Sequence, residues 1–102
     1  MDIQQESFTF KAVVDNMHKA LTLLLWIATA IKVEPTGFTC QLISAKDEKK
    51  QKGLTACLFF LQSYSVLDSW PENQYVHLTI TSCKPFSREL IEGILQSYAV
   101  TN

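Results

Sequence analysis

The segment from Leu54 to Leu61 constrains the fold most, because it predicts a strand that is apolar on both of its sides. Alternate residues of a strand point to opposite sides of a sheet. One side carries Leu54, Ala56, Leu58 and Phe60, and the other carries Thr55, Cys57, Phe59 and Leu61. A strand of this kind should be covered on both sides. One layer of helices covers only one side, so the other side needs a further partner.

Four more strands are predicted from runs of aromatic and β-branched residues. They are Phe8–Val14, Phe38–Ser44, Ser65–Ser69 and Tyr75–Cys83. Each lies next to a turn-forming or polar segment, such as the Pro35-Thr36-Gly37 turn before Phe38. Consecutive strands of this length form hairpins, so the sheet should be largely antiparallel.

Two helices are predicted beside these strands. Asp15 or Asn16 can cap a helix that continues to about Lys32. Its apolar stripe comprises Met17, Leu21, Leu24, Leu25, Ala28 and Ile31, and is widened by Leu23, Trp26 and Ile27. The second helix is expected to begin at Pro85. Its buried stripe comprises Phe86, Leu90, Ile91, Ile94, Leu95 and Tyr98.

The order of these elements predicts an α+β fold: a two-layer sandwich, with an antiparallel sheet that carries two helices on one face. Residues 1–102 should form a single domain. A short final strand after the second helix is compatible with this order. The second apolar side of Leu54–Leu61 is expected to meet another copy of the chain, with the sheets pairing across a homodimer.

Composition excludes several classes of function. Hydrophobic residues make up 47% and charged residues 19%, which is typical of a folded chain. A net charge of -1 provides no basic surface for nucleic acid or an anionic membrane. The apolar run Ala20–Ile31 has about 12 residues and is too short to span a bilayer. Cys40, Cys57 and Cys83 have no metal-site spacing. Reduced thiols and a polar amino terminus indicate a cytoplasmic protein.

The segment between Ser63 and Cys83 carries the functional signal. Ser63 follows a predicted strand, a Trp70-Pro71-Glu72 turn follows the serine, and Cys83 ends the next strand. This order resembles the prokaryotic S-adenosylmethionine decarboxylases, which depend on a pyruvoyl cofactor. The match extends from about Gly53 to Tyr98. It implies that Ser63 is the pyruvoyl precursor and Cys83 the proton donor.

The resemblance also implies how the cofactor would form. The Ser63 hydroxyl would attack the carbonyl of Gln62 to give an ester, and elimination would then cut the chain. The resulting pyruvoyl group acts as an electron sink. A hydroxyl needs activation by a neighbour, and the family supplies a second hydroxyl, here Thr55, and a histidine. Asp68 replaces that histidine, and a carboxylate with an ordinary pKa of about 3.9 is a weak base. We therefore expect Asp68→His to raise cleavage.

Four residues are interpreted individually. Cys83 is expected beside Lys84 and a helix amino terminus, which would lower the pKa of its thiol, although a small buried side chain is the alternative. Glu72 matches a glutamate that contacts the ribose of the substrate. Trp70 either shapes the turn or contacts substrate, and His77 has no counterpart role. The substrate site is expected between Ser63, Glu72 and Cys83.

Departures from the family leave two functions open. The family's His-Arg-Phe segment, which helps to hold the nucleoside, is Asp47-Glu48-Lys49 here, so its aromatic ring is missing. Gln5-Glu6-Ser7 replaces Gly-x-His. The favoured interpretation is an unprocessed relative linked to polyamine metabolism. It would bind a small amine or S-adenosylmethionine-like ligand, or regulate an active decarboxylase paralogue. The alternative is an active pyruvoyl-dependent decarboxylase of S-adenosylmethionine or of a smaller amino acid.

Overall fold

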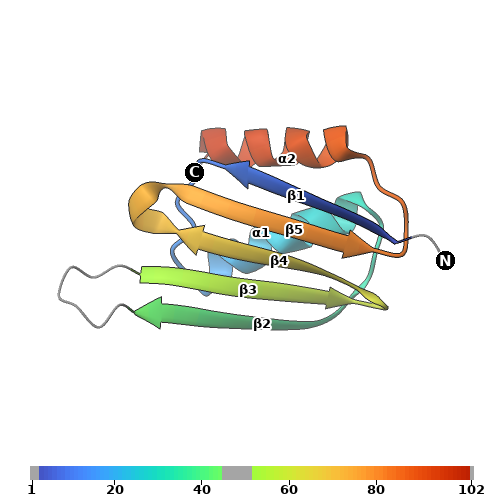
Figure 1. Cartoon of the computed structure of the whole chain (residues 1–102), viewed down its shortest axis with the longest axis horizontal. Coiled ribbons are helices and arrows are strands. Elements are labelled where there is room, and N and C mark those ends of the chain that lie inside the picture. Colours follow the sequence, from blue (N-terminus) through green and yellow to red (C-terminus); the bar gives the residue numbers. More distant parts are fainter. Residues whose placement is uncertain (1–2, 45–51, 102) are drawn as a thin grey trace.

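A five-stranded antiparallel sheet with two helices on one face makes up the fold, as Figure 1 shows. The computed structural model describes residues 3–44 and 52–101. The strands are β1 (Gln4–Phe10), β2 (Pro35–Ser44), β3 (Lys52–Phe60), β4 (Ser63–Trp70) and β5 (Tyr75–Ser82), in the spatial order β1-β5-β4-β3-β2. The helices are α1 (Met17–Ala30) and α2 (Arg88–Thr101), with a short 3-10 helix, η1 (Pro71–Asn73), between β4 and β5. The predicted α+β architecture is confirmed.

The first strand lies four residues earlier than predicted, at Gln4–Phe10 and not at Phe8–Val14. Its polar residues alternate with Phe8 and Phe10, which lie opposite Leu78 and Val76 of β5. A search for apolar residues therefore misses its amino-terminal half. The chain after Phe10 leaves the sheet and reaches α1 through Ala12 and Val14, which are buried in the core.

The second helix begins at Arg88, three residues after the predicted start at Pro85. Ser87 fixes this boundary, because its hydroxyl accepts a hydrogen bond from the Leu90 N–H at 3.2 Å. The helix then continues to Thr101, so the chain forms no final strand within the described residues. Leu90 was predicted to be buried, but it is 45% exposed.

The core lies between the helices and one side of the sheet. α1 contacts α2 as well as β2, β3 and β4, and its buried residues are Ala20, Leu23, Leu24, Ile27 and Ala28. Leu23 and Ile27 are therefore central to the stripe, whereas Met17 and Leu25, predicted to be buried, are 55% and 38% exposed. The sheet contributes Leu54, Leu58, Leu67, Leu78 and Ile80, all almost completely buried. No helix among the described residues is long and apolar enough to cross a membrane.

The other side of the sheet, here called the open face, is not covered by either helix and faces the viewer in Figure 1. Cross-strand registers place Phe59, Tyr64 and Thr81 in one row of this face and Thr55, Asp68 and His77 in another. Phe59 and Tyr64 are 42% and 40% exposed. Leu61, predicted to share the face, lies instead in the β3–β4 turn and is 79% exposed.

Candidate functional site

The hairpin between β3 and β4 positions Ser63. Phe60 and Ser63 face each other, so Leu61 and Gln62 form a two-residue turn. Gln62 has a φ of 58°, a left-handed conformation that is unfavourable for a residue with a side chain, by roughly 1–2 kcal/mol. The strand then starts with Ser63 pointing to the helix side, where it is 6% exposed. The predicted cleavage site is the Gln62–Ser63 bond. It therefore lies between a strained residue and a residue that is buried in the core.

Cys83 is the polar partner of Ser63. The Cys83 N–H donates to Ser63 Oγ at 3.0 Å, and Ser63 Oγ lies 3.5 Å from Cys83 Sγ, to which it donates. Beside the thiol is a groove of about 590 Å³, lined by Ile3, Gln4, Gln5, Glu6, Cys83 and Pro85. The structure therefore brings together two of the predicted catalytic residues, and a small molecule can reach one of them from the surface.

The surroundings of Cys83 differ from the expected ones. The helix begins at Arg88, five residues after Cys83, and not at Pro85. The Lys84 ammonium donates to the Lys32 carbonyl at 2.9 Å, beyond the end of α1. Ser82 stabilises the turn by accepting from the Lys84 N–H at 3.0 Å. The predicted helix start at Pro85 is therefore wrong, and within the described residues the hydrogen bonds of Cys83 are those with Ser63.

Thr55 and Asp68 form a second group on the open face. They face each other on β3 and β4, and Thr55 Oγ1 donates to Asp68 Oδ1 at 2.7 Å. His77 of β5 faces Asp68 on its other side, and Thr9 of β1 faces His77. Among the described residues, no salt bridge joins Asp68 to a cation. This group is a polar row across four strands with one carboxylate at its centre.

The two groups are far apart within one protomer. Ser63 and Asp68 are five positions apart on β4, which corresponds to ~16 Å along a strand. Five is an odd number, so their side chains also point to opposite sides of the sheet. Ser63 is buried with the helices, whereas Asp68 and Thr55 lie on the open face. The structure thus brings Ser63 together with Cys83 and Thr55 with Asp68, but not the two pairs with each other.

Trp70 and Glu72 lie at the far end of β4 from Ser63. Trp70 faces Tyr75 across β4 and β5, with ring centroids 5.3 Å apart and a 42° angle between the ring planes. Glu72 follows in η1 and is exposed. Ser63, Glu72 and Cys83 therefore do not enclose a site within one protomer. Asp47, Glu48 and Lys49 lie outside the described residues.

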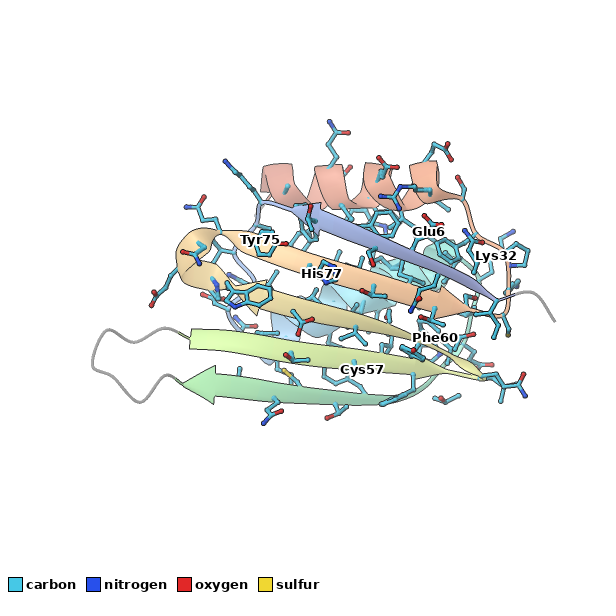
Figure 2. All side chains as sticks on the ribbon, viewed as in Figure 1. Glu6, Lys32, Cys57, Phe60, Tyr75 and His77 are labelled. Atoms are coloured by element: carbon cyan, nitrogen blue, oxygen red, sulfur yellow. The ribbon has the colours of Figure 1, made fainter. Side chains whose placement is uncertain are left out.

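Tyr75 and His77 lie at this end of the open face. The resemblance to the decarboxylase family did not identify either of them as a site residue. Figure 2 labels both on β5. The sequence did contain the information needed to find them. The Trp70-Pro71-Glu72 turn connects two strands of a hairpin, and pairing residues outwards from this turn places Trp70 opposite Tyr75 and Asp68 opposite His77. A resemblance to a family compares residues position by position along the chain, so it does not use the pairing between strands.

Two cysteines outside these groups have less acidic thiols. Burial raises the pKa of Cys57, on the open face, and of Cys40 on β2. A raised pKa reduces the thiolate fraction and hence the reactivity at neutral pH. In the described part of the chain, no three His, Cys, Asp or Glu side chains are grouped so that they could hold a metal ion.

Comparison with known proteins shows a shared fold. No protein-family model matches the sequence, and no curated protein matches it. The chain is similar to the crystal structure of the adenosylmethionine decarboxylase from Aquifex aeolicus vf5, with a TM-score of 0.63 and 12% sequence identity. The similarity covers 97% of this chain and 77% of that one. The chain therefore has the sheet and helix arrangement of an S-adenosylmethionine decarboxylase.

Proposed function

We propose that this chain is an unprocessed protein with a decarboxylase fold that binds a small metabolite and acts as a regulatory module in polyamine metabolism. The observation that carries the proposal is the separation of Ser63 and Cys83 from Thr55 and Asp68 within a protomer. Formation of a pyruvoyl group needs a base that removes the serine proton. The carboxylate that replaces the family's histidine lies on the other side of the sheet.

The hydrogen bonds of Ser63 support this proposal. Its oxygen accepts the Cys83 N–H, which engages one of its two lone pairs. Its proton is directed to a thiol sulfur, a weak acceptor. Ser63 and Cys83 fit the roles that a pyruvoyl cofactor would need. Among the described residues, however, no carboxylate or imidazole forms a hydrogen bond with Ser63. A wild-type chain should therefore remain whole.

The ligand is proposed to be a small amine. Asp68 and Glu72 offer carboxylates that pair well with ammonium groups. The family's aromatic ring for the nucleoside is replaced by Lys49 in the sequence, and stacking on a base is worth roughly 1–3 kcal/mol. An amine or an S-adenosylmethionine-like cation remains compatible with the two carboxylates. An active decarboxylase paralogue is the proposed partner for regulation.

The alternative, an active pyruvoyl-dependent decarboxylase, is favoured by one specific observation. Ser63 and the predicted proton donor Cys83 are in contact, and Gln62 in the left-handed conformation stores strain at the bond that would break. Cleavage would relieve this strain. The alternative requires that a base reaches Ser63 from a part of the assembly other than Asp68 of the same protomer.

Cleavage assays on three proteins test the proposal. Wild type, Asp68→His and Ser63→Ala would be purified, kept at neutral pH for several days and run on denaturing gels. The sequence alone predicts that Asp68→His raises cleavage. Because position 68 lies on the open face ~16 Å from Ser63, we instead expect all three chains to remain whole. Two fragments that meet between Gln62 and residue 63 in wild type, absent from Ser63→Ala, would support the active enzyme.

A further inference from the structure

The two edges of the sheet differ in how far side chains cover them. β1 and β2 are the edge strands, because each pairs with one neighbour only, β5 and β3 respectively. An unpaired edge presents a row of free backbone N–H and C=O groups, which can pair with another chain. In Figure 1, β2 forms the lower border of the sheet, and no other strand or helix of the described residues lies beyond it.

The edge of β1 is covered by a charged side chain from α2. Arg88 donates to the Ser7 carbonyl at 3.1 Å and pairs with Glu6 at 2.7 Å. Its guanidinium also lies over the ring of Phe8, 4.3 Å from the ring centroid. Charged side chains at an edge discourage pairing with a further strand. The β1 edge is therefore protected against the addition of another chain.

The register of the sheet shows which backbone groups of β2 are free. Phe60 and Ser63 flank a two-residue turn, so they form a hydrogen-bonded pair and Phe60 directs its N–H and C=O towards β4. Successive residues of an antiparallel strand bond to opposite neighbours, so Phe59 bonds towards β2, where the Thr36 hydroxyl donates to its carbonyl at 3.2 Å. Gly37 faces Phe59, so Gly37 and every second residue after it bond to β3. The residues between them direct their N–H and C=O groups away from the sheet: Phe38, Cys40 and Leu42.

The free edge of β2 is also uncharged and partly apolar. The segment Pro35–Ser44 contains no Asp, Glu, Lys or Arg. Leu42 is 65% exposed, and Phe38 and Cys40, on the same side of the strand, are half-buried at the margin of the core. β2 therefore lacks the protection that Arg88 gives to β1.

From this contrast we infer that the edge of β2 binds an extended, uncharged segment of a partner protein as a sixth strand of the sheet. A row of free groups that repeats every ~7 Å is matched by a backbone that is itself extended. An uncharged edge fits a segment without charged residues, because an unpaired charge in the contact would be costly. Apolar side chains of the segment lie beside Leu42. This interaction surface goes beyond the proposed function, since it is separate from Ser63 and from the open face.

A peptide strand with one free edge tests the inference. The probe is acetyl-Val-Thr-Val-Thr-Val-amide with an N-methyl group on both threonines, so only the valine edge can pair. The same peptide with every residue N-methylated is the control. In the full-length protein, we expect the amide resonances of Phe38, Cys40 and Leu42 to shift saturably at millimolar probe. Those of Ser7 and Thr9, on the covered edge of β1, should not shift.

Variants at the exposed position 42 separate edge pairing from other contacts. Leu42→Lys places a charge in the contact, so the probe should bind roughly tenfold more weakly. Leu42→Pro removes one free N–H, which an edge strand tolerates, and should also weaken binding. Thr9→Lys is the matched control, because Thr9 is exposed on the other edge strand and should leave the affinity unchanged. Circular dichroism identifies folded variants, and either folded variant of Leu42 is sufficient.

The outcomes divide clearly. Saturable shifts at the β2 edge that the fully methylated peptide does not produce, and that a variant of Leu42 weakens, support the inference. Absence of saturable shifts at millimolar probe, or an affinity that no variant of Leu42 changes, overturns it. Shifts of the same amides that depend on protein concentration without any probe would assign the edge to a second copy of the chain, and would also overturn it.

Discussion

Tyr98 illustrates how one side chain connects the helix layer to the core. It is 5% exposed on α2, and its ring meets Phe10 of β1 edge-on, with centroids 6.4 Å apart and an interplanar angle of 88°. Such pairs add about 0.5–1.5 kcal/mol beyond the burial of apolar area. Burial raises the pKa of Tyr98, and the nearby charge of Asp15 raises it further. The neutral phenol is therefore favoured in the folded state.

This shift predicts a loss of stability in alkali. A raised pKa in the native state means that the folded chain binds more protons than the unfolded chain above pH ~10. The contribution of Tyr98 is thus fully present below pH ~10 and is lost as the pH rises through its folded pKa. Melting temperatures between pH 8 and 11.5 measure the effect. Tyr98→Phe should lose part of the alkaline decline. Equal slopes for wild type and Tyr98→Phe would contradict this assignment.

Helices and strands were predictable where their periodicity is strong. The existence of β3, β4, β5 and both helices follows from the sequence, because apolar residues recur at the spacing of each element. β1 was misplaced because it is a partly polar edge strand whose partner, β5, is distant in sequence. The start of α2 was misplaced because the Ser87 cap, and not Pro85, sets it. The residues of the site could be predicted one by one. The side of the sheet on which each lies depends on alternation along β4, and positions 63 and 68 are an odd number of residues apart, so they lie on opposite sides.

The start of α1 gives a prediction at the same scale. Asn16 adopts an extended conformation, and its side chain accepts the Lys19 N–H at 2.9 Å. Removing such a cap costs ~1 kcal/mol, which lowers the melting temperature of a domain of this size by roughly 4–8 °C. Thermal unfolding of Asn16→Ala measures the loss, and Asn16→Asp, which retains an acceptor, serves as the control. A melting temperature of Asn16→Ala equal to that of wild type would show that another group caps the helix.

The whole molecule leaves one face of its sheet without cover. The open face carries four large side chains that are 40–45% exposed: Phe59, Tyr64, Trp70 and Tyr75. Burying apolar area contributes ~25 cal/mol per Å², before the cost of association is subtracted. A second copy of the chain can provide the same surface in return, as in any two-fold interface. The predicted homodimer would place the open face between two sheets.

Sedimentation equilibrium at micromolar concentration tests the predicted dimer. We expect wild type to associate and Phe59→Asp to be a monomer, because the charge would lie in the apolar interface. Trp26→Glu is the matched control, since Trp26 is 43% exposed on α1 and away from the open face. Alkylation of Cys57, which lies on the open face, should also slow as the protein concentration rises. A wild-type monomer at all concentrations would show that the open face has a different partner.

We expect the wild-type chain to remain uncleaved, because the described contacts of Ser63 include no carboxylate or imidazole, and the mass of the protein tests this expectation. The chain would be incubated at neutral pH, denatured, treated with hydroxylamine and measured by mass spectrometry. Hydroxylamine cuts an ester between Gln62 and Ser63 but leaves the amide intact, so it also reveals an arrested intermediate. We predict a single species near 11.6 kDa before and after treatment. A fragment that ends at Gln62, with or without hydroxylamine, would contradict the account.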